Sequence, residues 1–267
     1  MRVCSRWCVG VAALCLGAVC SPTGQARGDG YGTVTGQFVL DGAIPTLKPL
    51  VAKGDDTVKD AAICAKQAVP DESLVVDSAT NGIANVFVYM PKAPKDIYPG
   101  LKESKEKLVK FDQKGCRFFP HALILRTDQT IAILSADLIL HNTDVVAVRN
   151  TGQNSTITQD RVGNTKWTFP EAEKMPVMVK CDIHNWMRAW WLIVDHPYAA
   201  ISGKDGTFTI EKVPAGTQEF TAWQDANDGR WVFGKTRATR VIKVNVQPNK
   251  TTSIGVIKIP ATVLEKK

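Results

Sequence analysis

The chain has 267 residues, enough for one or two domains, with 33 basic and 26 acidic side chains and a formal net charge of +7. The sequence contains no C-x-x-C-H haem motif, H-E-x-x-H zinc helix, nucleophile elbow or P-loop, which excludes the enzyme classes that those motifs mark. The lysines are dispersed and no nucleic-acid-binding motif occurs, so the charge suits a basic soluble protein or one with an acidic protein partner.

The first 26 residues have the pattern of a signal peptide. Arg2 and Arg6 precede an apolar run over residues 7–19, which is too short for a bilayer span of about 20 residues. A small-residue exit over residues 23–26 follows, so we expect cleavage near Ala26 and a periplasmic or secreted mature chain without a transmembrane segment. Lipid attachment at Cys20 is the less favoured alternative.

Short apolar segments rich in β-branched residues follow, separated by glycine and proline. They lie at residues 32–40, 83–90, 122–125, 130–134, 145–148, 176–180 and 190–194. Helical patterns are restricted to short turns around residues 59–67 and 104–108. Strands at this spacing predict an all-β sandwich or barrel.

The last third of the chain predicts β-hairpins. The Asp205-Gly206 turn precedes alternating Phe208 and Ile210, and a second turn at residues 214–216 precedes Phe220 and Trp223. Together with residues 32–36 as a first strand and 84–89 as a second, this stretch resembles the carboxypeptidase regulatory-like, or transthyretin-like, sandwich.

More than a hundred residues separate the second of these strands from Asp205. We therefore expect a discontinuous transthyretin-like sandwich over residues 28–95 and 197–262, with a second β domain over residues 105–195 inserted into it. A tandem arrangement of the two domains remains the alternative.

The expected inserted domain carries a metal-binding pattern. Cys181, His184 and Met187 lie in the loop between two predicted strands, and His141 lies 40 residues before the cysteine at the end of another strand. Two imidazoles and a thiolate with a weak axial thioether form the ligand set of an electron-transfer copper centre.

This pattern, with Asn142 beside the first histidine, resembles the cupredoxin family, and the short ligand loop is most similar to that of the amicyanins. The resemblance implies a Greek-key sandwich and one mononuclear type 1 copper ion that carries single electrons between redox partners. It also implies that His141, Cys181, His184 and Met187 are the copper ligands and that Asn142 steadies the ligand loop. Two departures are the absence of an aromatic residue over 174–180 and the presence of Trp186 in the loop. An exposed Trp186 would offer a docking patch for a partner protein.

The cysteine count supports a free thiol at residue 181. Removal of the leader takes Cys4, Cys8, Cys15 and Cys20, leaving three cysteines in an oxidising compartment. A Cys64–Cys116 disulfide would leave Cys181 free. The alternative is a zinc site formed by Cys116, His121, Cys181 and His184.

The chain contains four histidines, too few for the trinuclear cluster of a multicopper oxidase, so we expect an electron carrier and no enzyme. The alternative function is a non-redox binding module on the transthyretin-like scaffold, recognising protein or polysaccharide, with a structural or stored metal.

Overall fold

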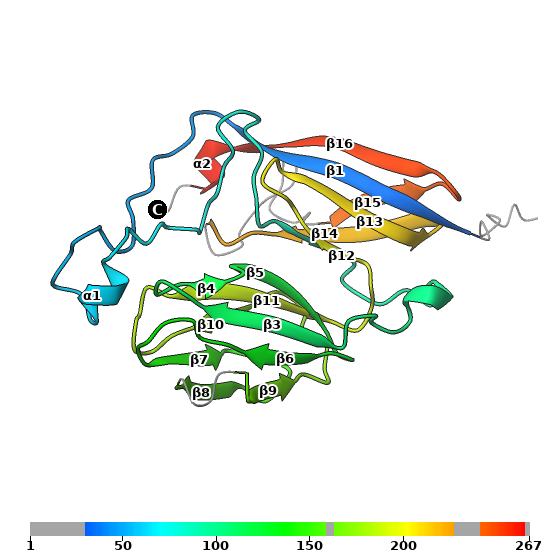
Figure 1. Ribbon diagram of the computed structural model, residues 1–267. Helices are drawn as coiled ribbons and strands as arrows, with labels where there is room; N and C mark the ends of the chain where they lie inside the picture. Colours follow the sequence, from blue (N-terminus) through cyan, green and yellow to red (C-terminus); the bar gives the residue numbers. More distant parts are fainter. Residues whose placement is uncertain (1–29, 159–162, 227–240, 265–267) are drawn as a thin grey trace, which may run out of the picture.

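Two β-sandwiches form the part of the chain that the computed structural model describes, residues 30–158, 163–226 and 241–264 (Figure 1). The helices there are single turns, namely α1 (Ala61–Cys64), η1 (Pro99–Leu101) and α2 (Ala261–Leu264). None of these helices reaches the length or apolar character needed to cross a bilayer. The prediction of an all-β fold is confirmed. The expected leader over residues 1–26, including Cys20, lies outside the described residues.

The upper sandwich of Figure 1 is formed by strands from both ends of the chain. One sheet has the order β13-β1-β16, and the sheet packed on it has the order β12-β2-β14-β15. The strands are β1 (Tyr31–Asp41), β2 (Phe87–Tyr89), β12 (Ala199–Ile201), β13 (Thr207–Pro214), β14 (Gly216–Trp223), β15 (Val241–Val246) and β16 (Thr251–Pro260).

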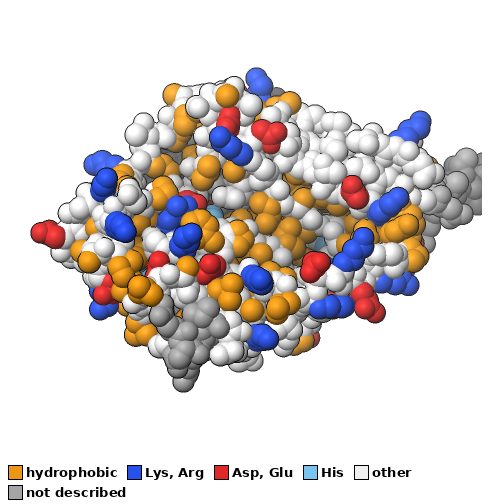
Figure 2. All heavy atoms as spheres, in the orientation of Figure 1, with side chains coloured by type: hydrophobic (Ala, Val, Ile, Leu, Met, Phe, Trp, Pro, Cys, Tyr) orange, Lys and Arg blue, Asp and Glu red, His pale blue; other side chains and the backbone are white. Residues whose placement is uncertain are grey.

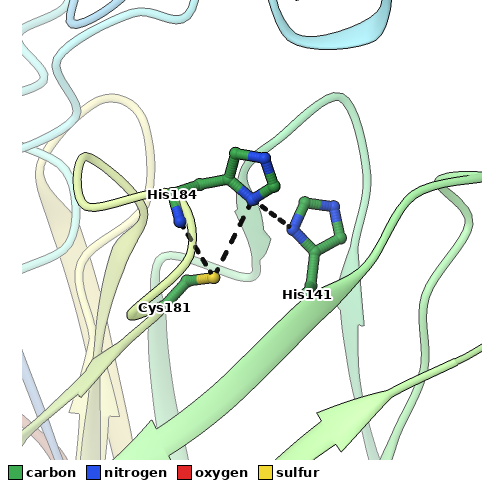
Figure 3. Close-up of side chains that lie close together, drawn as sticks. All are labelled: His141, Cys181 and His184. Carbon is green, nitrogen blue, oxygen red and sulfur yellow. Dashed lines mark hydrogen bonds between the residues drawn. The ribbon is translucent and has the colours of Figure 1, made fainter. Parts of the chain in front are cut away.

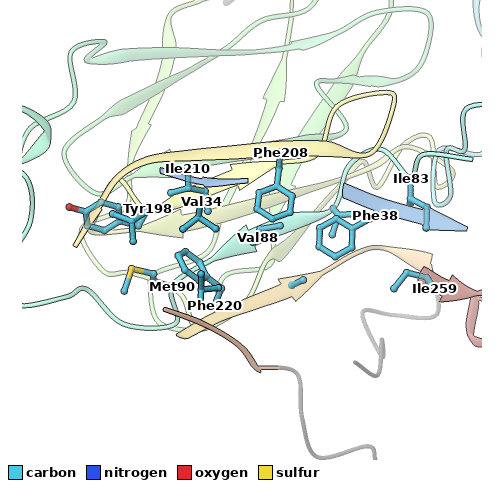
Figure 4. Close-up of a cluster of buried hydrophobic side chains, with 14 of the residues drawn as sticks. Val34, Phe38, Ile83, Val88, Met90, Tyr198, Phe208, Ile210, Phe220 and Ile259 are labelled. Atoms are coloured by element: carbon cyan, nitrogen blue, oxygen red, sulfur yellow. The ribbon is translucent and has the colours of Figure 1, made fainter. Parts of the chain in front are cut away.

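Alternating apolar residues build the core of the upper sandwich. Val34 and Phe38 of β1 point inward with Phe208 and Ile210 of β13, and Figure 4 shows these side chains against Phe220 of the facing sheet. The hairpin entrance at residue 206 requires glycine, because its φ is +80° and a Cβ there would lie 2.1 Å from the backbone oxygen of Phe38.

The lower sandwich is formed entirely by strands between residues 108 and 194. One sheet has the order β5-β11-β10-β7-β8 and the other has the order β4-β3-β6-β9. The strands are β3 (Leu108–Gln113), β4 (Phe118–Phe119), β5 (Ala122–Arg126), β6 (Thr130–Ile133), β7 (His141–Val145), β8 (Gln153–Ile157), β9 (Thr165–Thr168), β10 (Val177–Lys180) and β11 (Arg188–Val194).

Strand β11 connects the two cores. Trp191 and Ile193 point into the lower sandwich, whereas Leu192 and Val194 point toward the upper one and pack near Phe87 and Trp223. A strand that is buried on both faces has apolar residues at successive positions. This explains why apolar and polar residues do not alternate over residues 189–194.

Three expected elements differ from the structure. Residues 104–108 form no helix, because Ser104 donates its backbone N–H and its hydroxyl to Asp128 and Leu108 begins β3. The strand expected at residues 145–148 lies earlier and begins at His141. The strand expected over residues 83–90 is confined to β2, although residues around it are also buried.

Candidate metal centre

The three strongest ligand candidates lie at one end of the lower sandwich. Strands β7 and β10 are antiparallel neighbours, with Val145 opposite Val179 and Asp144 opposite Lys180. The start of β7, at His141, therefore lies beside the loop that follows β10 and contains Cys181 and His184.

The donor atoms of these residues converge on one point, as Figure 3 shows. Nδ1 of His141 lies 3.1 Å from Nδ1 of His184, which lies 4.0 Å from Sγ of Cys181. One nitrogen or sulfur atom from each residue falls within a group whose members are all within 4.8 Å of one another. Ligand atoms about 2.0–2.3 Å from a shared ion lie about 3–4 Å apart, so the donor set fits a single metal ion.

The centre is closed to solvent. Both imidazoles are 0 % exposed and Cys181 is 2 % exposed. The backbone N–H of His184 donates to the Cys181 sulfur at 3.4 Å, which anchors the thiolate within its own loop.

Met187 completes the loop, and its side chain is buried in the same core cluster as Cys181. Its backbone N–H donates to the carbonyl of His184 at 2.9 Å, and its carbonyl accepts from the N–H of Cys181 at 3.2 Å. These bonds close a tight turn that contains Cys181 and His184. The axial role of Met187 stays a prediction.

Asn142 connects β7 to the ligand loop. Its Oδ1 accepts from the backbone N–H of Asp182 at 2.7 Å and lies 3.3 Å from Sγ of Cys181. Its Nδ2 donates to Asp182 at 2.8 Å and to Asn154 at 3.0 Å. The ligand loop is therefore held at a fixed distance from His141.

Each imidazole is also oriented by a carboxylate that the sequence analysis did not identify. Nε2 of His141 lies 3.0 Å from Asp137, and Nε2 of His184 lies 3.0 Å from Asp60. A carboxylate on the second ring nitrogen fixes the tautomer and leaves the first nitrogen free for a metal. The spacing of four residues between Asp137 and His141 is a signal that could have been found. Asp60 lies 124 residues from His184, and no local pattern marks it.

The charges of the site favour a thiolate. Burial raises the pKa of the Cys181 thiol, but hydrogen bonds with His141 and His184 outweigh this effect and bring the pKa down to about 6. Burial lowers the pKa of the His141 imidazole, yet the hydrogen bond to Asp137 and the nearby sulfur bring the pKa up to about 9. These opposite pKa shifts favour a proton on His141 over one on Cys181, so a metal ion competes with the His141 proton.

Cys64 and Cys116 form a disulfide, and Cys181 is the free cysteine among the described residues. The Cys116 sulfur is therefore unavailable to a metal, although Asp137 and His141 lie near it. His121 pairs with Asp225 at 3.2 Å and is not part of the group around Cys181. The alternative zinc site is wrong, because the disulfide occupies the Cys116 sulfur and His121 lies outside the group of donor atoms around Cys181.

Trp186 lies beside the centre and is partly buried. Its Nε1 donates to the carbonyl of Cys116 at 3.2 Å, and its ring contacts the His184 ring edge-on, with 5.2 Å between centroids. The indole thus closes one side of the ligand loop.

No protein-family profile matches the chain, and no curated protein matches it. Partial likenesses to solved structures were found. A Cu-containing nitrite reductase from Thermus scotoductus SA-01 is 17 % identical, with a TM-score of 0.29 over 37 % of this chain and 25 % of that protein. The chain therefore spans a quarter of the length of the reductase.

Two smaller proteins of known structure also resemble part of this chain. A purple cupredoxin from Nitrosopumilus maritimus is 15 % identical, with a TM-score of 0.26 over 32 % of this chain and 98 % of the other. An oxidized variant of amicyanin is 15 % identical, with a TM-score of 0.27 over 40 % of this chain and 97 % of the other. The assignment of the centre rests on its own donor atoms.

Proposed function

We propose that this protein is an exported copper protein that carries single electrons through one type 1 copper ion bound by His141, Cys181, His184 and, axially, Met187. The observation that carries the proposal is the convergence of two Nδ1 atoms and one sulfur at a buried point. A thiolate with two imidazoles suits both oxidation states of copper, because sulfur stabilises Cu(I) and imidazole binds Cu(II).

Several residues support electron transfer by keeping the ligands in place. Asp137 and Asp60 fix the imidazole rings, and Asn142 fixes the loop of Cys181. Ligands that do not move between oxidation states keep the reorganisation small. Bound copper supplies the one-electron chemistry, and the chain supplies a rigid, dry site for it.

The closed site favours a carrier over an enzyme. A catalytic metal keeps an open position for substrate, whereas the three donors here are at most 2 % exposed. The formal net charge of +7 falls to about +5 when Arg2 and Arg6 leave with the leader, and it still suits an acidic redox partner protein in the periplasm or outside the cell.

The test is addition of Cu(II) to the purified mature protein, followed by optical and EPR spectroscopy. We expect an intense thiolate-to-copper absorption that is lost in Cys181→Ser and retained in His196→Gln, a buried histidine outside the centre. Wild-type protein that is colourless at full copper occupancy contradicts the proposal. A coloured protein that does not exchange electrons with ferrocyanide favours the non-redox binding module instead.

A further inference from the structure

A cleft of about 300 Å³ lies beside the loop that carries Cys181 and His184. Its apolar walls come from both halves of the chain and include Leu50, Val69, Phe118, Met178, Trp186 and Trp190. Figure 2 shows apolar side chains gathered along the band where the two sandwiches meet. Polar and charged side chains, among them Asp71, Glu72, Arg117 and Arg188, make up the rest of the lining. A cavity that combines apolar walls with polar groups is the usual form of a small-molecule site.

The ligand loop itself forms one wall of the cleft. Consecutive residues from Asn185 to Arg188 line it, and the indole of Trp186 also contacts the imidazole of His184, with 5.2 Å between ring centroids. Because Trp186 is held by its hydrogen bond to Cys116, it forms a fixed bridge between the cleft and the centre. An occupant touching this indole is one side chain away from a metal ligand.

A histidine–aspartate pair that the metal centre does not use lies in the lining of the cleft. Nε2 of His121, at the start of β5, lies 3.2 Å from Oδ2 of Asp225, which follows β14. The two side chains are 7 % and 17 % exposed. A histidine backed by a carboxylate accepts a proton from a bound hydroxyl, since the carboxylate stabilises the imidazolium.

The size and the mixed lining of the cleft favour a small, uncharged aromatic molecule that carries hydroxyl groups. An apolar cavity of ~150 Å³ holds benzene, so this cleft has room for a substituted ring. Arg117 is paired with Glu72. With His121 neutral, the carboxylates of Asp71, Glu72 and Asp225 outnumber the guanidinium groups of Arg117 and Arg188, so the lining disfavours an anionic ligand. Trp186 and Trp190 supply aromatic surface for stacking.

We propose that this cleft binds a small phenolic molecule of the hydroquinone class, which passes an electron through Trp186 to the metal centre and its hydroxyl proton to His121. The electron step rests on the function proposed above. The O–H bond breaks, the proton goes to the His121 imidazole, and the electron reduces Cu(II) to Cu(I). The product is an aryloxyl radical, which a second oxidised protein molecule converts to the quinone by removing another electron and proton.

Binding is tested on the metal-free mature protein with benzene-1,4-diol as the probe, by saturation-transfer NMR and calorimetry. Leu50→Trp fills the mouth of the cleft, and Leu47→Trp is the matched control, because Leu47 is a similarly exposed leucine of the same segment outside the cleft. We expect Leu50→Trp to weaken binding at least tenfold and Leu47→Trp to leave it unchanged. Absence of saturable binding, or equal binding by both variants, overturns the proposal.

The electron step is tested on the copper-loaded protein by stopped-flow spectroscopy. We expect the reduction rate to saturate with benzene-1,4-diol, and His121→Gln to lower this rate about 100-fold relative to the rate with ferrocyanide, which releases no proton. If ferrocyanide reduces the copper-loaded protein but the reduction rate does not saturate with the diol, this inference is overturned and the proposed function stays intact. Failure of both reductants, despite binding of the diol, overturns the proposed function and the electron step with it.

Discussion

The imidazole of His184 forms a hydrogen bond with a carboxylate from a distant part of the chain. Asp60 lies in the segment that connects β1 to β2 of the upper sandwich, yet its carboxylate reaches His184 of the lower sandwich at 3.0 Å. The backbone of Asp60 is left-handed, with φ of 54°, and its carbonyl accepts the N–H groups of Ile63 and Cys64 in α1. The position of this carboxylate is therefore fixed by the turn of α1 that follows it.

Replacement of Asp60 by asparagine tests this contact. The variant keeps a hydrogen-bond acceptor and tolerates the left-handed backbone, but it removes the negative charge beside the imidazole. We expect copper affinity to fall about 10- to 100-fold and the reduction potential to rise, because Cu(II) loses more stabilisation than Cu(I). Chelator competition and spectroelectrochemistry measure both quantities. Asp55→Asn, in the same segment, is the control, and an equal shift in both variants would count against the role of Asp60.

A second histidine contact predicts how stability depends on pH. Nε2 of His196 donates to the carbonyl of Met90 at 3.1 Å, and its Nδ1 accepts from the N–H of Tyr198 at 3.2 Å. Burial holds the pKa of this imidazole below its ordinary value. The folded state thus binds this proton less readily than the unfolded state, so stability is full above about pH 6.5 and is lost as the pH falls below it.

Urea unfolding of metal-free protein at pH 7.5 and pH 5.5 measures this loss. We expect the wild-type protein to lose more unfolding free energy between the two values than His196→Gln, which has no imidazole to protonate. Identical losses in the two proteins would show that His196 does not titrate in this range. His141 and His184 are common to both proteins, so their contribution cancels in the comparison.

At the scale of elements, α1 is attached to the lower sandwich by the Cys64–Cys116 disulfide. The two cysteines are 52 residues apart in sequence, and Cys116 also donates its backbone N–H to Asp137, which orients His141. The disulfide therefore lies between the two carboxylates that orient the imidazoles.

Removal of the disulfide in the double variant Cys64→Ser/Cys116→Ser is expected to destabilise the metal-free protein by about 4 kcal/mol, from the chain entropy of a loop of this length. Chemical denaturation of the wild-type and double-variant proteins measures the difference. We also expect weaker copper binding, because Asp60 directly precedes α1. An unchanged denaturation midpoint would mean that the loop is held by its other contacts.

The sequence predicted some strands better than others. Residues 190–194 are apolar throughout and were identified, and the Asp205-Gly206 turn marked β13 and its hairpin. Strands β8 and β9 were missed, because they lie at sheet edges and are largely polar. β16 was missed as well, since it is mostly exposed and pairs in parallel with β1, more than 200 residues away in sequence. Edge strands gain their structure from partners that a local pattern cannot show.

The same limit applies to the centre. His141, Cys181 and His184 could be found because two histidines and a cysteine are the ligands of an electron-transfer copper centre. Cys181 and His184 also lie three residues apart in one loop. Asp60 and the His121–Asp225 pair could not, because each contact joins residues more than 100 positions apart. The division of the chain into domains remains a proposal, although strands 108–194 share no sheet with the rest of the described chain.

For the whole molecule, the two sandwiches are joined by an apolar cluster that contains Phe87, Leu192 and Trp223. Leu192 is fully buried there and belongs to β11, which also forms part of the lower core. This shared strand couples the unfolding of the two sandwiches.

Leu192→Ala tests the coupling. We expect a loss of about 2–5 kcal/mol, because the substitution leaves a cavity between the sandwiches. We also expect calorimetry to resolve two transitions where the wild-type protein shows one. Leu47→Ala, at an exposed position, is the control. A single transition at the wild-type temperature would indicate that the two sandwiches are held together elsewhere.

The pairing of β1 with β16 has a consequence for the metal centre. The segment that carries Asp60 begins where β1 ends, and β1 pairs with β16, more than 200 residues further along the chain. The three donor residues, His141, Cys181 and His184, all precede that partner strand in the chain. The carboxylate that orients His184 therefore depends on a pairing that forms only when residues 251–260 are available to β1.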